Sequence, residues 1–182
     1  MLSVAVIFFT FALGAWVAGL YLIGMGSEPA EEGGSDPLST VGWIELIVGI
    51  ILTTQVFILV QQSGGDGLIL ILAGLVLLFA VFFTAFGAAL IKGADLRPIG
   101  NLAIPVGILA GFYVTFDGFL DAGGESIWVF KSSAIVWLVG FLLIAGFTYG
   151  KVSAKLLGWA LILVALGGFL PAVLLALNQP LF

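Results

Sequence analysis

The sequence predicts an all-α membrane protein, a single domain over residues 1–182 that crosses the bilayer six times. Of its 182 residues, 62% are hydrophobic and 8% are charged, and the mean hydropathy is +1.31. A soluble domain carries roughly 25% charged residues, so this chain has too few charges to cover its surface in water. The apolar residues also gather into six long runs separated by polar segments. Lipid must therefore be the solvent for most of the chain.

Each of the six runs is long enough, or nearly so, to cross the hydrocarbon core as a helix, which takes roughly 20 residues. The expected spans are about residues 2–25, 41–60, 67–91, 99–116, 127–149 and 156–177. The connections between them are rich in glycine, proline and acidic residues, a composition typical of turns. Only the first and the fourth connections, residues 26–40 and 117–126, exceed a tight link.

Basic residues predict the orientation of the spans. Four of the five lie in connections on the side opposite the termini, and only Lys131 lies on the side of the termini; the four are Lys92, Arg97, Lys151 and Lys155. Cytoplasmic connections carry the excess of lysine and arginine in membrane proteins. We therefore expect both termini outside and the basic connections in the cytoplasm, in a multi-pass protein of the plasma (inner) membrane.

The composition argues against several classes of function. The chain has no cysteine and no histidine, so it lacks a thiol nucleophile, the commonest general base and the commonest metal ligand. Its net charge of −5 argues against nucleic acid as a partner, because phosphates need clustered lysine and arginine. We expect no enzyme activity, no cofactor and no metal. A passive pore, a transporter of small molecules or a membrane assembly factor remains.

Polar residues inside the spans are the candidates for contact with a solute, because polar groups are expensive in lipid. Glu45 is the only acidic residue within an expected span. It either orients a substrate at a pore mouth or forms an interfacial ion pair with Arg97 or Lys151. The amide of Gln55 needs partners, which could come from a neighbouring helix or a passing amide. Asn101 in the fourth span is a weaker candidate.

Two aromatic pairs have the i, i+4 spacing that places both rings on one face of a helix. They are Phe82 with Phe86 in the third span, and Trp137 with Phe141 in the fifth. Such pairs most often pack within a bundle. They are also the strongest candidates for a pore constriction in this chain.

Three segments resemble the urea/amide channel family of the UreI and AmiS type. DPLST at residues 36–40, followed by ELIVG at 45–49, resembles the entry to that family's second span, where the pattern is DP-x-S and then N-x-F-V-G. ADLRP at 94–98 resembles its L-D-x-R link between the third and fourth spans. LPA-x-LL at 170–175 resembles the end of its last span. The order, the spacing and the six-span layout also fit.

The chain departs from the family pattern at positions that bear on selectivity. The family's Asn in the second span is matched here by Glu45, after a one-residue insertion. The family's last span can carry a buried Glu, and here Leu163 or Val164 stands at that place. The fifth span can be rich in Trp in the family, whereas here Trp137 is its only internal one.

The resemblance implies passive permeation of urea or short aliphatic amides, which are small, uncharged and planar. It also implies one pore per protomer in a ring-shaped homo-oligomer, a hexamer. The family lines its channel with aromatic residues from the third and fifth spans. We therefore expect Phe82 or Phe86 to face Trp137 or Phe141 across a narrow constriction.

Two other functions are compatible with the residues. One is a proton-coupled transporter of small solutes that uses Glu45 as its proton carrier. The other is a membrane scaffold or chaperone that transports nothing and whose polar residues only pack. Solute flux without a pH gradient separates the channel from the coupled transporter, and absence of any flux favours the scaffold.

Overall fold

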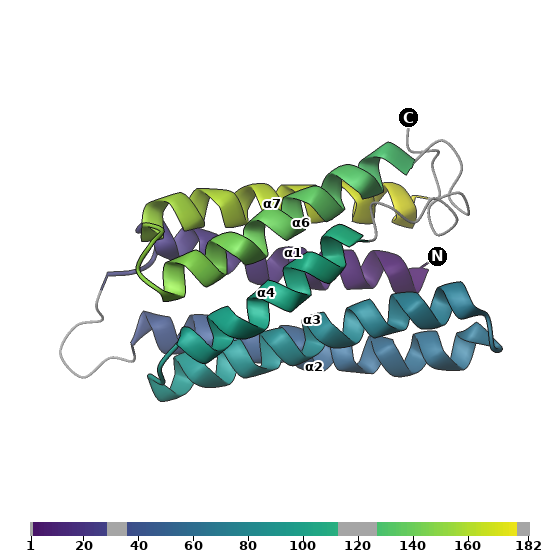
Figure 1. Ribbon diagram of the computed structural model, residues 1–182, viewed down its shortest axis with the longest axis horizontal. Coiled ribbons are helices and arrows are strands. Elements are labelled where there is room, and N and C mark those ends of the chain that lie inside the picture. Colours follow the sequence, from purple (N-terminus) through teal and green to yellow (C-terminus); the bar gives the residue numbers. More distant parts are fainter. Residues whose placement is uncertain (1, 29–35, 113–126, 178–182) are drawn as a thin grey trace.

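The computed structural model describes residues 2–28, 36–112 and 127–177. These residues form six helices (Figure 1), which are α1 (Leu2–Leu22), α2 (Pro37–Ser63), α3 (Gly67–Lys92), α4 (Arg97–Phe112), α6 (Ile127–Thr148) and α7 (Ala154–Ala176). The predicted all-α class is confirmed. Of the two longer connections expected from the sequence, residues 29–35 of the first (26–40) and all of the second (117–126) lie outside the described residues.

Five of the described helices are long and apolar enough to cross a membrane. The described part of α4 is shorter, with 16 residues, which is about 24 Å at the rise of an α-helix. The expected fourth span continued to residue 116, and its last four residues lie outside the described part of the chain. The six-helix layout therefore agrees with the six predicted crossings.

Local sequence signals set where the helices begin and end. Asp36 and Asp66 cap α2 and α3, because each carboxylate accepts a hydrogen bond from the backbone N–H two residues later, at 2.9 and 2.8 Å. Gly64 and Gly93 end these two helices in the left-handed conformation, with φ of 54° and 59°. As a result α2 begins at Pro37, a full turn before the apolar run that predicted its start at residue 41.

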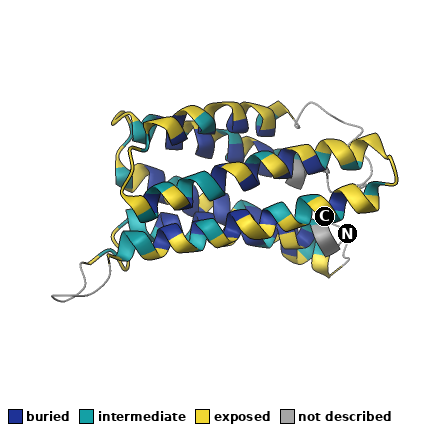
Figure 2. Cartoon of the chain, turned by 90° about the horizontal axis from the view of Figure 1, so that it is seen from below, coloured by how far each residue is buried: buried dark blue, intermediate teal, exposed yellow. Residues whose placement is uncertain are grey.

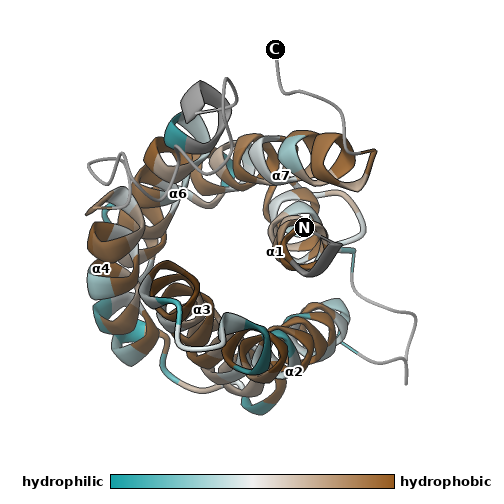
Figure 3. Ribbon diagram, turned by 90° about the vertical axis from the view of Figure 1, so that its right-hand side faces the viewer, coloured by the Kyte–Doolittle hydropathy of each residue, from teal (hydrophilic) through white to brown (hydrophobic). Residues whose placement is uncertain are grey.

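The helices form a closed ring. Each helix contacts the next in the order α1, α2, α3, α4, α6 and α7, and α7 returns to contact α1. The view along the ring axis shows this arrangement (Figure 3). Successive helices run in opposite directions, so the start of α1 and the end of α7 lie at the same end of the bundle (Figure 1). We call the opposite end, where the connections carrying Lys92, Arg97 and Lys151 lie, the basic end.

Glycines hold three pairs of helices at close range, as expected where no hydrophobic force draws helices together in lipid. A Cβ atom added at Gly87 of α3 would lie 2.6 Å from the backbone oxygen of Gly42 of α2. One added at Gly19 of α1 would lie 2.9 Å from the backbone oxygen of Gly158 of α7. One added at Gly107 of α4 would lie 2.8 Å from the Cβ atom of Phe141 of α6. These same three pairs make the most extensive contacts of the ring. The ring is therefore built from three tightly packed helix pairs.

Exposed residues lie on the outside of the ring and buried residues face its interior (Figure 2), and many of the exposed residues are large and apolar. Exposed apolar side chains include Phe57 of α2, which is 67% exposed, and Leu163 of α7, which is 62% exposed. In water such a surface would cause aggregation. It suits contact with lipid tails or with other membrane-embedded protein.

Replacing Gly87 by Ala should destabilise the protein, because the added methyl group meets the backbone of Leu46 and Gly42 on α2. Overpacking of this kind typically costs about 1 to 3 kcal/mol. The matched control is Gly74→Ala in the same helix, where no atom lies within 4 Å of the added Cβ. Thermal melting in detergent should fall for Gly87→Ala and stay level or rise for Gly74→Ala. Equal melting temperatures would show that the α2–α3 contact is not tight.

Candidate functional site

A cavity of about 180 Å³ lies inside the ring. Its lining comes from α1, α2, α3, α6 and α7, and from Leu96 in the link before α4. Most of these residues belong to the C-terminal halves of α1, α3 and α6 and the N-terminal halves of α2 and α7. Because those halves meet at the basic end, the cavity extends from that end toward the middle of the bundle.

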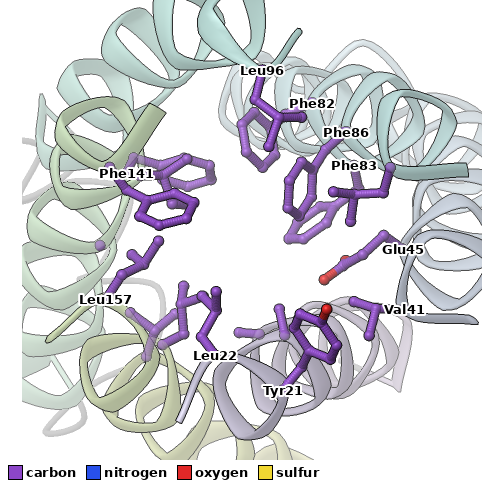
Figure 4. Close-up of a pocket in the computed structure, with 18 of the residues that line it drawn as sticks. Tyr21, Leu22, Val41, Glu45, Phe82, Phe83, Phe86, Leu96, Phe141 and Leu157 are labelled. Atoms are coloured by element: carbon purple, nitrogen blue, oxygen red, sulfur yellow. The ribbon is translucent and has the colours of Figure 1, made fainter. Parts of the chain in front are cut away.

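Glu45 places a carboxyl group in this cavity. Its side chain is 1% exposed, and its Oε2 atom has no hydrogen-bond partner among the described residues. The close-up view shows the carboxyl of Glu45 and the hydroxyl of Tyr21 directed into the cavity from α2 and α1 (Figure 4). A buried polar atom without a partner is rare in native proteins and calls for an explanation.

The interfacial ion pair considered for Glu45 is contradicted by the structure. Arg97 instead binds Asp95, and its Nε atom lies 2.8 Å from the carboxylate. These hydrogen bonds hold the pKa of Asp95 below its usual range. No salt bridge joins Glu45 to a lysine or arginine in the described parts of the chain. Because α2 starts four residues earlier than predicted, Glu45 also lies too deep in the helix to reach the surface.

Gly14 on α1 provides the space that the carboxyl occupies. A Cβ atom at Gly14 would lie 2.6 Å from Oε2 of Glu45 and 3.3 Å from the ring of Phe83. The carboxyl of Glu45 and the ring of Phe83 therefore both lie next to the backbone of α1 at Gly14, where no side chain separates them from it. Nothing in the sequence pattern distinguished this glycine from the other glycines of the spans.

The aromatic residues expected at a constriction lie close together. The rings of Phe82 and Phe141 meet edge to face with centroids 5.0 Å apart, and Phe86 stacks on Phe82 at 5.8 Å. All three line the cavity, as does Trp137. The structure thus brings the third and fifth spans together through Phe82 and Phe141. A role for this contact as the constriction of a pore stays a prediction.

Trp137 has different neighbours from those expected. Its ring contacts Phe11 and Phe8 of α1 at 4.9 and 5.1 Å, and Phe79 of α3 at 5.6 Å. Its Nε1 atom is buried and has no acceptor among the described residues. The cavity lining thus includes two residues with an unpartnered buried polar atom, Glu45 and Trp137.

The other two polar candidates do not line the cavity. Gln55 is half-buried, and its Oε1 atom lacks a partner in the described structure. Asn101 lies on the exposed surface of α4, where its Oδ1 atom accepts a hydrogen bond of 2.6 Å from the Tyr149 hydroxyl. Neither residue faces the space in which Glu45 lies.

Sequence reasoning missed the contribution of α1 to the site. Phe11 lines the cavity and contacts four other rings, and Tyr21 adds a hydroxyl. Two of the rings that Phe11 contacts, Phe79 and Phe83 of α3, have an i, i+4 spacing that predicts a shared helix face. The role of Phe11 had no such signal, because it depends on the return of α7 to α1 and the closure of the ring.

The cavity is mostly apolar, with a few polar side chains in its lining. The lining combines an apolar aromatic wall with one carboxyl, one phenol hydroxyl, one threonine hydroxyl and one indole N–H. No group of three or more potential metal ligands occurs within the described residues. Small-molecule sites commonly have this composition, a mostly apolar lining with a few polar groups that fix orientation.

Comparison with known protein families identifies a family. The chain matches the AmiS/UreI family transporter description over residues 37–179, which covers α2 to α7. No curated protein matches the sequence significantly.

Comparison with solved structures finds the same architecture at low sequence identity. A crystal structure of the urea channel from the human gastric pathogen Helicobacter pylori is 14% identical, with a TM-score of 0.78 over 96% of this chain and 98% of that one. A cryo-EM structure of the H. pylori urea channel in a closed state is 15% identical, with a TM-score of 0.77 over 96% and 97%. This likeness shows that the fold is shared.

Trp137→Ala should enlarge the cavity at its inner end. Truncation of a buried Trp costs about 3 to 5 kcal/mol in a packed core, so melting in detergent should fall. If Trp137 also limits passage, larger solutes such as glycerol should pass while urea flux is kept or raised. Flux ratios and melting should be measured on the same preparation. A lower melting temperature with unchanged solute ratios would assign Trp137 to packing alone.

Proposed function

Because the chain belongs to the AmiS/UreI family of transporters, we propose that it is a facilitative channel for urea or short aliphatic amides. The observation that carries the proposal is the cavity within the six-helix ring, which has an aromatic lining and a single buried carboxyl. Membership in a transporter family confirms the expectation that the chain is not an enzyme.

The lining suits small, planar and uncharged solutes. Rings of α3 and α6 in contact, such as Phe82 and Phe141, offer flat apolar faces. A hydrated ion would lose its water there without compensation, and this loss is prohibitively expensive. Urea and amides lose only a few hydrogen bonds, which the polar groups of the cavity can replace.

The outer surface supports assembly of several copies, each with its own pore. Large apolar side chains cover the outside of the ring, including Trp43 and Ile47 of α2 and Leu166 of α7. A ring-shaped homo-oligomer, a hexamer by family resemblance, would cover part of this surface and leave the rest to lipid. Each protomer encloses its own cavity, so the pore does not depend on the oligomer axis.

A proton-coupled transporter is the second candidate, and the buried carboxyl of Glu45 favours it. Buried acidic residues within a membrane often serve as proton carriers. The two candidates differ in one measurable property. A channel conducts its solute down the concentration gradient at the same rate with or without a pH gradient, whereas a coupled transporter does not.

Purified protein in liposomes should accelerate urea and acetamide entry without a pH gradient, measured by stopped-flow light scattering against protein-free liposomes. The flux should also be constant between about pH 5 and pH 7.5. The chain has no histidine, ordinary carboxyls titrate near pH 4, and Arg97 lowers the pKa of Asp95 further. Glu45 is the only acidic residue of the described chain that lines the cavity.

Three outcomes would contradict this proposal. Flux that requires a pH gradient would favour the coupled transporter. A steep change of flux between pH 5 and pH 7.5 would show that an acidic group titrates in that range, either Glu45 or one in residues 117–125. No protein-dependent flux of any solute would favour a scaffold.

We expect the termini outside and the basic end in the cytoplasm. Since the natural chain has no cysteine, single cysteines report their own side of the membrane. Gln62→Cys, beside the α2–α3 turn, should react with an impermeant thiol reagent added to intact cells. Ala94→Cys, in the exposed α3–α4 link, should react only after the cells are lysed. The reverse pattern would overturn the orientation.

A further inference from the structure

The carboxyl of Glu45 is the feature of the cavity that packing leaves unexplained. It is almost completely buried, its Oε2 atom has no partner among the described residues, and it is directed into the cavity (Figure 4). Gly14 leaves the space in which it lies. A residue retained only for packing would be apolar here, because an unpartnered buried polar group is destabilising.

The surroundings of Glu45 favour the neutral acid. No lysine or arginine lines the cavity, and Arg97 binds Asp95 outside it. The other polar side chains of the lining are Tyr21, Trp137 and Thr148, and the Thr148 hydroxyl already donates to the oxygen of Ala145. An ionised carboxylate without a cation is strongly disfavoured in an apolar space. The neutral acid carries an O–H donor and a C=O acceptor on one planar edge.

One class of solute complements that edge. A primary amide, and each half of urea, carries an N–H on the same side as its C=O. It can therefore form two hydrogen bonds to a carboxylic acid at once, donating to the acid C=O and accepting from the acid O–H. A secondary amide strongly prefers the trans form, which places its N–H opposite the C=O. It can form only one of the two bonds.

The aromatic lining would hold the solute in the orientation that this pairing requires. Glu45 lies eight residues after the start of α2, and Phe86 lies six residues before the end of α3. At 1.5 Å per residue both are roughly 10 Å from the basic end. The ring of Phe83 and the carboxyl of Glu45 both lie next to Gly14. A planar solute lying along the rings would therefore present its edge to Glu45.

We infer that Glu45 is the specificity-determining residue of the cavity, selecting solutes whose N–H and C=O lie on one edge through a paired hydrogen bond to its neutral carboxyl. This inference rests on the proposed channel function. It differs from a proton-carrier role, because the carboxyl here binds its solute without changing its protonation state.

The test compares two isomers of equal composition, acetamide and N-methylformamide, in liposomes containing the full chain. Acetamide has the matching edge, whereas N-methylformamide prefers the trans form and lacks it. The wild type should conduct acetamide about tenfold faster after subtraction of the lipid background, as expected for one additional hydrogen bond. Glu45→Leu should reduce this ratio to about one. Glu45→Gln should retain the ratio, because its amide carries the same donor and acceptor edge.

Gln55→Leu is the matched control. It removes another polar side chain from the same helix, also with an unpartnered atom, but from outside the cavity lining. Its acetamide to N-methylformamide ratio should equal that of the wild type. Melting in detergent should be recorded for each variant, so that a ratio is compared only between folded proteins.

Two results would overturn the inference while leaving the channel function intact. One is a Glu45→Leu protein that conducts both isomers with the wild-type ratio. The other is a Glu45→Gln protein that behaves like Glu45→Leu, because that would show that the ionisable group itself is required. Absence of flux of any amide in the wild type would instead overturn the proposed function, and the inference with it.

Discussion

Close approach of helix backbones is the constraint on which this structure depends. Lipid tails supply no hydrophobic force to bring helices together, so contact must come from fit. Gly87, Gly19 and Gly107 supply it at the three tightest helix pairs, where even one added methyl group would collide. The three closely packed helix pairs lie side by side and form a ring that encloses the cavity. Larger residues at these positions would force the helices apart and change that space.

The interior of the ring combines two kinds of side chain that protein cores usually keep apart. Aromatic rings of α1, α3 and α6 meet one another at centroid distances near 5 Å, as in a well-packed core. Beside them lies the carboxyl of Glu45, over the bare backbone of Gly14. A core selected for stability alone would have no reason to retain that acid. The interior therefore holds a polar group that packing alone does not explain.

The sequence predicted the architecture well because hydrophobic length and turn chemistry are local properties. The six helices and their order followed from apolar runs, and the start of α2 was misplaced because its cap, Asp36, precedes the apolar run. The site was harder to predict. Phe82, Phe86 and Phe141 could be proposed from spacing, but the place of Glu45 inside the ring and of Asn101 outside it depends on how each helix is rotated. That rotation is set by long-range contacts such as α1 with α7.

The pairing of α1 with α7 has a consequence for how the chain is made. α1 leaves the ribosome before α7, yet its most extensive contacts are with α7, so it finds that partner only when α7 has been inserted. Until then the ring is an open arc that ends at α1 and α6. Leu157, Leu161 and Val164 of α7 line the cavity, so the cavity is complete only after α7 has closed the ring.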